Sequence, residues 1–166
     1  DERPEVINSR EEFGHWEIDT VVGTKDSSEV LLTLDERTTR YRHIIKISSR
    51  SAKAVEEGIR QLQASYGERF RSVFRSITSD NGSEFTSLPQ LLPSTPIYYA
   101  HPYSAYERGL NEKQNSLIRR FFPKGRSLDG VSPDAIQRVQ DWINRMPRKS
   151  FSYASATELF QTVLFD

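Results

Sequence analysis

The stretch FGHWEIDTVVGT, residues 13–24, alternates apolar and polar side chains with the period of a β-strand. Its alternation places Trp16 and Ile18 on one face and Glu17 and Asp19 on the other. Aspartate is depleted in strands, so Asp19 in the middle of a β-branched strand is the first candidate functional residue. The plainer alternative is a charge at the edge of a sheet.

The segments that follow predict the rest of an α/β fold. EVLLTLDE (29–36) and RYRHIIKIS (40–48) read as two more strands, and their short connections favour an antiparallel meander. Helical spacing then appears at 52–66, and further patterns predict strands at 72–80 and 95–100 and helices at 87–92, 105–122, 132–146 and 155–165. This order predicts a five-stranded mixed sheet, three antiparallel strands and then two parallel ones, with helices on both faces.

Composition indicates one globular domain. The chain has 166 residues, of which 36% are hydrophobic and 28% charged, and no apolar run approaches the length of a membrane span. The absence of cysteine excludes disulfides and cysteine zinc sites and permits a reducing cytosol. We expect a polar arm over residues 1–12 and a single domain over 13–166.

The net charge is zero but unevenly distributed. Eleven acids and three bases give residues 1–36 a net charge of −8, while six bases without an acid give residues 37–53 a net charge of +6. Residues 101–126 carry six bases and two acids, a net charge of +4. Such basic patches can attract a polyanion, although charges that merely cover a solvated surface are the common alternative.

Two more carboxylates lie at positions where ligand sites form. Asp80 ends the strand at 72–80, where α/β sheets bind ligands, unless it is an ordinary residue of the Asp-Asn-Gly turn. A helical wheel places Glu112 with Asn115 and Arg119 on an outward polar face, opposite Leu110, Gln114, Leu117 and Phe121. Glu112 could instead pair with Arg108 or Arg119. Taken together, the three acids offer the hard oxygen ligands that Mg²⁺ prefers.

The blocks HWEIDTVVG (15–23), SDNGSEF (79–85) and ERGLNEKQNSLIRRFFPKG (107–125) resemble the catalytic core of DDE transposases and retroviral integrases, most closely the insertion-sequence-thirty family of bacteria. NRMPRKSFSYASATELF (144–160) is similar to the end of that family's core. The resemblance implies a ribonuclease-H-like fold in which Asp19, Asp80 and Glu112 are the catalytic acids and hold two Mg²⁺ or Mn²⁺ ions. The chain departs from the family pattern at positions 106, 110, 113, 114, 116 and 156, none of which is one of the three acids.

The function implied is metal-dependent cleavage of DNA at transposon ends and strand transfer into target DNA, in a homo-oligomer assembled on DNA in the bacterial cytoplasm. The expected DNA contacts are Asn115, Arg119, Arg120, Lys124 and Arg126. Two alternatives stay open: a nuclease of the same fold that cuts without joining, and a non-catalytic DNA-binding domain. His15, His43 and His101 are expected to serve packing or phosphate contact only. No helix-turn-helix precedes Trp16, so the chain resembles an isolated catalytic domain.

Overall fold

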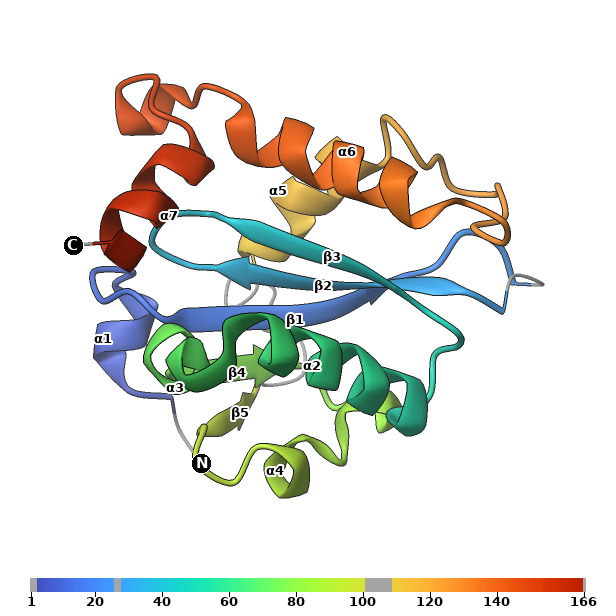
Figure 1. The fold of residues 1–166 in the computed structure, drawn as a ribbon, viewed down its shortest axis with the longest axis horizontal. Coiled ribbons are helices and arrows are strands. Elements are labelled where there is room, and N and C mark those ends of the chain that lie inside the picture. The colour runs from blue at the N-terminus through green and yellow to red at the C-terminus, as the bar shows by residue number, and fades with distance from the viewer. Residues whose placement is uncertain (1–2, 26–27, 101–108, 166) are drawn as a thin grey trace.

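The computed structural model describes residues 3–25, 28–100 and 109–165, with side chains from residue 112 onward in the last range (Figure 1). One sheet with the order β3-β2-β1-β4-β5 forms its centre. β1 pairs antiparallel with β2 and parallel with β4, β2 pairs antiparallel with β3, and β4 pairs parallel with β5. The strands are β1 (His15–Val21), β2 (Val30–Glu36), β3 (Arg42–Ile47), β4 (Ser76–Ser79) and β5 (Ile97–Tyr99). The predicted mixed sheet is therefore confirmed.

Helices cover both faces of this sheet (Figure 1). One face carries α2 (Ala52–Tyr66), α3 (Phe70–Val73) and α4 (Leu88–Leu91), and the other carries α5 (Gly109–Ile118) and α6 (Pro133–Arg145). The short α1 (Glu5–Asn8) and α7 (Ala156–Phe165) lie at one end. Ser51 and Ser132 cap α2 and α6, each accepting a hydrogen bond from a backbone N–H of the first turn. None of the described helices is long and apolar enough to cross a membrane.

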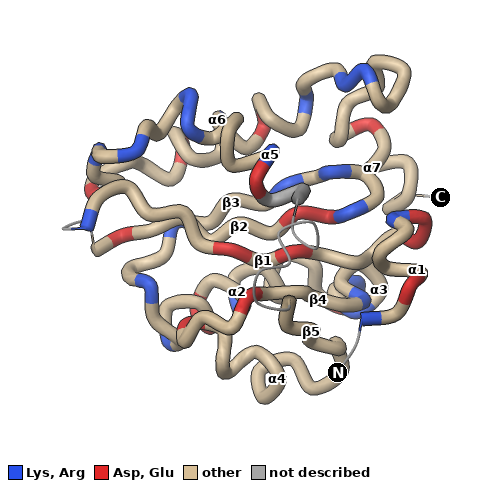
Figure 2. Tube along the Cα trace, turned by 180° about the vertical axis from the view of Figure 1, so that it is seen from behind, with Lys and Arg blue, Asp and Glu red and all other residues tan. Residues whose placement is uncertain are grey.

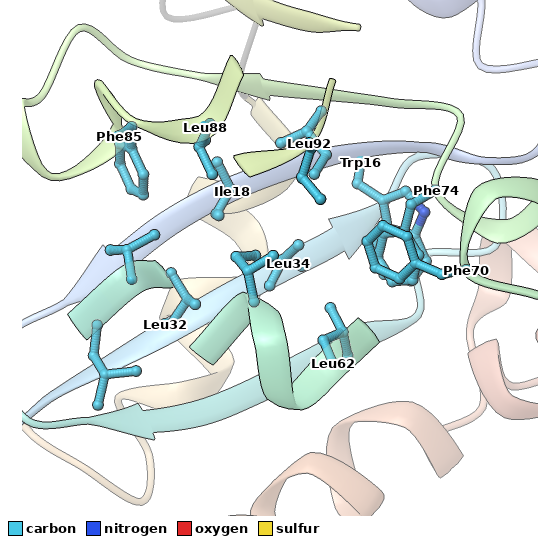
Figure 3. Packing of buried hydrophobic residues seen from close by; sticks show 14 of the residues in the cluster. Trp16, Ile18, Leu32, Leu34, Leu62, Phe70, Phe74, Phe85, Leu88 and Leu92 are labelled. Atoms are coloured by element: carbon cyan, nitrogen blue, oxygen red, sulfur yellow. The ribbon is translucent and has the colours of Figure 1, made fainter. Parts of the chain in front are cut away.

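The predicted strand over 72–80 is too long. Residues up to Val73 belong to α3, and the strand begins only at Ser76. The reason is the aromatic packing of this segment (Figure 3). The Phe74 ring stacks on the Phe70 ring with 4.5 Å between ring centroids and on the Trp16 ring with 4.4 Å between them. The indole N–H of Trp16 also donates to the Val73 carbonyl at 2.9 Å. Tertiary contacts with β1 thus decide where this strand starts.

The opposite face of the sheet combines an apolar cluster with buried ion pairs. Val21, Leu31 and Ile44 pack against Ile118 of α5 and Ile143 of α6. Beside this cluster, Arg42 donates two hydrogen bonds of 2.6 Å to Asp35, and Arg37 is paired with Glu17. All four charged side chains are buried, so each carboxylate depends on its guanidinium for compensation.

Amide side chains of α6 occupy the outer edge of β3. Asn144 accepts from the Arg42 backbone N–H and donates to the Arg42 carbonyl, both at 2.8 Å. Gln140, one turn earlier, accepts from the Ile44 N–H at 2.8 Å. These side chains satisfy backbone groups that an edge strand would otherwise present to another chain.

The N-terminal segment, predicted as an arm, contacts the domain in its described part. Ile7 is buried, and its carbonyl accepts from Arg37 at 3.1 Å. Arg3 donates to the Thr78 hydroxyl of β4 at 3.2 Å.

Candidate active site

Asp19 and Asp80 come from the two parallel strands at the centre of the sheet. β1 and β4 pair in the register Trp16↔Ile77 and Glu17↔Thr78. Continuing that register by two residues places Asp19 opposite Asp80, on strands that are about 4.8 Å apart. Both residues are half-buried. The sheet therefore brings the first two predicted acids together.

Each aspartate is held by a nearby backbone amide. The Thr20 N–H donates to Asp19 at 2.9 Å, and the Gly82 N–H donates to Asp80 at 2.7 Å. The hydrogen bond from Gly82 belongs to the Asp-Asn-Gly turn, so Asp80 is also the turn residue that the sequence offered as the alternative to a ligand. Turn and site are compatible here, because a carboxylate has several acceptor positions.

Helix α5 crosses the face of the sheet on which Asp19 lies. Gln114 of α5 donates to Asp35 at 3.3 Å, and Asp35 pairs with Glu17 across β1 and β2. Ile118, one turn later, packs in the cluster that contains Val21. Asp19 lies between Glu17 and Val21 on the same face of β1, so the turn of α5 between these contacts passes over it.

Glu112 is exposed on the first part of α5, as predicted. Figure 2 shows the acidic segment of α5 in front of the sheet that carries the acidic segments of β1 and β2. Within the described part of the chain, however, no three His, Asp or Glu side chains lie close enough together to hold a metal ion. Glu112 therefore does not form such a group with the two aspartates.

The residues nevertheless fit a divalent cation in their chemistry. Carboxylates of Asp19, Asp80 and Glu112 are hard oxygen donors, and two of them are already neighbours. Asn115, one turn after Glu112, has a buried Oδ1 without a hydrogen-bond partner among the described residues. A buried amide oxygen normally finds a partner, so this atom is available to a metal-bound water or a ligand donor.

The outward placement predicted for Asn115 and Arg119 is wrong. Both are half-buried, and Arg119 donates to the carbonyls of Val22 at 3.0 Å and Phe122 at 3.3 Å. Phe121, predicted to face inward, is 41% exposed. For Arg119 and Phe121 the cause is the end of α5 at Ile118, four residues before the predicted end, after which the helical wheel no longer applies. Asn115 lies within α5, so the end of the helix does not account for its burial. The prediction for Leu110 concerns a side chain outside the described ones.

The other predicted DNA contacts lie on the surface beyond α5. Arg120, Lys124 and Arg126 are exposed. The Arg120 guanidinium lies 6.0 Å from the ring centroid of Trp142, which is a cation–π distance. These side chains can therefore reach a phosphate without desolvating a buried charge.

Two of the three histidines serve packing. His15 shares a hydrogen bond of 2.7 Å with the Ser76 hydroxyl, and His43 shares one of 2.7 Å with the Tyr66 hydroxyl. Burial among aromatic rings lowers the pKa of His43 to about 4, so this ring is neutral at pH 7. His101 lies outside the described residues.

Two charged residues beside the aspartates were not predicted from the sequence. Glu84 is buried in the 3₁₀ turn Ser83–Phe85 and accepts from Arg50 at 3.0 Å. The hydrogen bond to Glu84 and the charges of Glu84, Asp80 and Asp19 raise the pKa of Arg50. Glu84 lies in the SDNGSEF block, four residues after Asp80, which was a usable signal. No sequence pattern singles out Arg50.

Comparison with known proteins identifies the family of the chain. Residues 9–108 match the family model of the integrase core domain. A probable transposase for an insertion-like sequence element of Streptococcus salivarius is 42% identical over 97% of this chain. The transposase InsI for insertion sequence element IS30A of Escherichia coli K12 is 32% identical over 96% of it. The chain spans only 45% and 41% of those two proteins.

The fold is also similar to solved integrase structures. The catalytic core domain of BIV integrase matches with a TM-score of 0.67 and 16% identity, over 92% of this chain and 96% of that one. The fold is therefore ribonuclease-H-like, as the resemblance implied. A simian T-cell lymphotropic virus intasome structure matches with a TM-score of 0.64 and 17% identity, over 87% of this chain and 53% of that one.

Proposed function

The chain belongs to the integrase core domain family, and from this premise we propose that it is the catalytic core of a DDE transposase. Its reaction is cleavage of DNA at transposon ends and strand transfer into target DNA by phosphodiester transesterification. The observation that supports the proposal is the β1–β4 register, which, continued by two residues, pairs Asp19 with Asp80 on neighbouring parallel strands.

Asp19, Asp80 and Glu112 would hold two Mg²⁺ or Mn²⁺ ions. Bound ions of this kind activate the attacking water or 3′-hydroxyl and offset charge on the transferred phosphate. The chain would hold two of these ligands, Asp19 and Asp80, in fixed positions and leave the third, Glu112, free to adjust its side chain. Asp19 and Asp80 are fixed by the sheet and by backbone N–H donors, whereas Glu112 lies exposed on a helix.

DNA would reach this site along the surface around the end of α5. Arg120, Lys124 and Arg126 are exposed and suited to backbone phosphates, which positions DNA without reading its sequence. Asn115 lies closer to the acids, where its unpartnered Oδ1 can accept from a bound water. Arg119 is committed to two carbonyls, so its contribution is to fix the loop that presents Lys124 and Arg126. A homo-oligomer would present transposon ends and target together.

The test is metal binding and DNA chemistry by the chain and its Asp80→Asn variant. Asparagine keeps the acceptor for the Gly82 N–H but removes a charged ligand. We expect the parent to bind Mn²⁺ in calorimetry and to give cleaved and joined DNA products with Mg²⁺ or Mn²⁺. Asp80→Asn should lose both, while Asp141→Asn on α6 serves as the matched control.

Three results separate the alternatives. Cleavage without joined products would indicate a nuclease. DNA binding without any Mn²⁺ binding would indicate a non-catalytic domain. Equal activity of Asp80→Asn and the parent would remove Asp80 from the ligand set.

A further inference from the structure

A buried carboxylate beside the two aspartates holds a surface arginine in place. Glu84 is 4% exposed, and its Oε1 accepts from Arg50 Nε at 3.0 Å and from the Thr20 hydroxyl at 3.3 Å. Thr20 directly follows Asp19 in β1, and its N–H donates to Asp19. Glu84 is thus connected to the residue next to one candidate metal ligand.

Glu84 also lies near the other candidate ligand, Asp80. A Cβ on Gly82 would lie 2.7 Å from Glu84 Oε2 and 2.8 Å from Asp80 Oδ1, so both carboxylates approach the same glycine. Asp80 and Glu84 therefore border the turn that follows β4, and Asp19 lies on the neighbouring strand β1. Arg50 is the guanidinium that faces them, and all three charges act on it.

The contact leaves most of the guanidinium available. Arg50 uses Nε for Glu84, and within the described residues its two terminal nitrogens donate no hydrogen bond. Its side chain is 55% exposed, whereas the carboxylate that orients it is buried. A guanidinium fixed at Nε presents its remaining N–H donors as a planar fork, the geometry that matches a phosphate.

We propose that Arg50, oriented by Glu84, is a binding site for a backbone phosphate of the DNA strand that reaches Asp19 and Asp80. This inference rests on the proposed function and adds a phosphate contact on the side of the site opposite α5. We assign Glu84 the role of a positioning residue, because its Oε1 is engaged by Arg50 and Thr20; the Mn²⁺ measurement below tests whether its second oxygen binds metal. Arg50 lies in the loop before α2, so the phosphate that it binds would lie on the α2 side of the two aspartates.

The experiment measures DNA affinity across a salt series and Mn²⁺ affinity without DNA. The variants are Arg50→Gln and Glu84→Gln, and Arg60→Gln is the matched control on the same side of the sheet. Arg60 is also an exposed arginine paired with a glutamate, Glu56, but it lies on the outer surface of α2.

Arg50→Gln should bind DNA several-fold more weakly, with a salt slope smaller by about 0.9, the value for one lost phosphate contact. It should bind Mn²⁺ at least about threefold more tightly, because a cation no longer faces the aspartates. Glu84→Gln should keep the salt slope and lose DNA affinity, since the charge remains but its orientation is lost. Arg60→Gln should match the parent in both measurements.

Two results would overturn the inference. One is a salt slope for Arg50→Gln equal to that of Arg60→Gln. The other is a loss of Mn²⁺ affinity in Glu84→Gln as large as in Asp80→Asn, which would make Glu84 a ligand. If Arg50→Gln unfolds at assay temperature, Arg50→Lys replaces it. Weaker DNA binding by Arg50→Lys with an unchanged salt slope would then support the inference, and DNA affinity equal to that of the parent would oppose it. Absence of metal-dependent cleavage by the parent would count against the proposed function only, since the DNA measurements need no cleavage.

Discussion

Replacing Gln114 with leucine should loosen α5 from the sheet. Gln114 is 1% exposed and forms three hydrogen bonds through its amide. It donates to the Arg40 carbonyl at 2.7 Å and to Asp35 at 3.3 Å, and it accepts from Arg148 at 3.0 Å. Leucine fills a similar volume but offers no partner to any of these groups.

The expected loss is about 2 kcal/mol of unfolding free energy. An orphaned buried acceptor such as the Arg40 carbonyl costs about 1–3 kcal/mol. The Asp35 contact is long and Asp35 keeps both bonds from Arg42, so its share is small. Arg148 is half-buried and can turn to water. The buried apolar surface of leucine offsets part of this loss of unfolding free energy. For a chain of this size, the corresponding change is a melting temperature lower by about 4–8 °C.

Urea unfolding and amide hydrogen exchange check this expectation. Exchange should accelerate most in the amides of α5, and Mn²⁺ affinity should fall, because Glu112 is carried by the same helix. Gln137→Leu is the matched control, since Gln137 is exposed and, within the part of the chain that the structure describes, its side chain bonds only to Asp141 of the same helix. A Gln114→Leu variant within about 0.5 kcal/mol of the parent would refute the argument that these hydrogen bonds fix the helix.

Three further outcomes are expected. His43 is neutral in the folded chain, with a pKa of about 4 against 6.5 for the free group. The free energy of unfolding should therefore fall by about 2–3 kcal/mol as the pH drops from 6.5 to 4. Calorimetric scans against pH should show that His43→Gln loses less stability over this range. Gly82→Ala keeps an unstrained backbone, but its Cβ would lie 2.7 Å from Glu84 and 2.8 Å from Asp80, so it should cost about 1–3 kcal/mol in urea unfolding and weaken Mn²⁺ binding. Unchanged Mn²⁺ affinity would show that this turn does not shape the site. Lys124→Ala with Arg126→Ala should lower the salt slope of DNA binding by up to about 1.8, while a parental slope would place the DNA elsewhere.

The first three strands and the face of Asp19 could be predicted from the sequence because they depend on local alternation. Period-two patterning fixes which side of β1 carries Glu17 and Asp19, whatever the strand pairs with. The SDNG turn likewise predicts the end of β4 near Asp80. These features need no knowledge of distant residues.

The parts that failed are those decided by distant contacts. The end of α5 depends on Arg119 reaching the Val22 carbonyl, 97 residues earlier. The start of β4 depends on Phe74 stacking against Trp16. The pairing of Glu84 with Arg50 joins a turn to a loop 34 residues away. No periodicity within either segment carries that information.

The attachment of α6 to the edge of β3 also has a consequence for synthesis of the chain. Arg42 and Asn144 are 102 residues apart, so the meander β1–β3 leaves the ribosome long before the side chains that cover its edge. At about 5–20 residues per second, that interval lasts roughly 5–20 s. During it, β3 offers its backbone donors and acceptors to any other nascent strand, and crowded polysomes would bring such strands close. A cell that overproduces this chain is therefore expected to lose much of it to co-translational aggregation, and slower initiation, which spaces the ribosomes apart, should recover it.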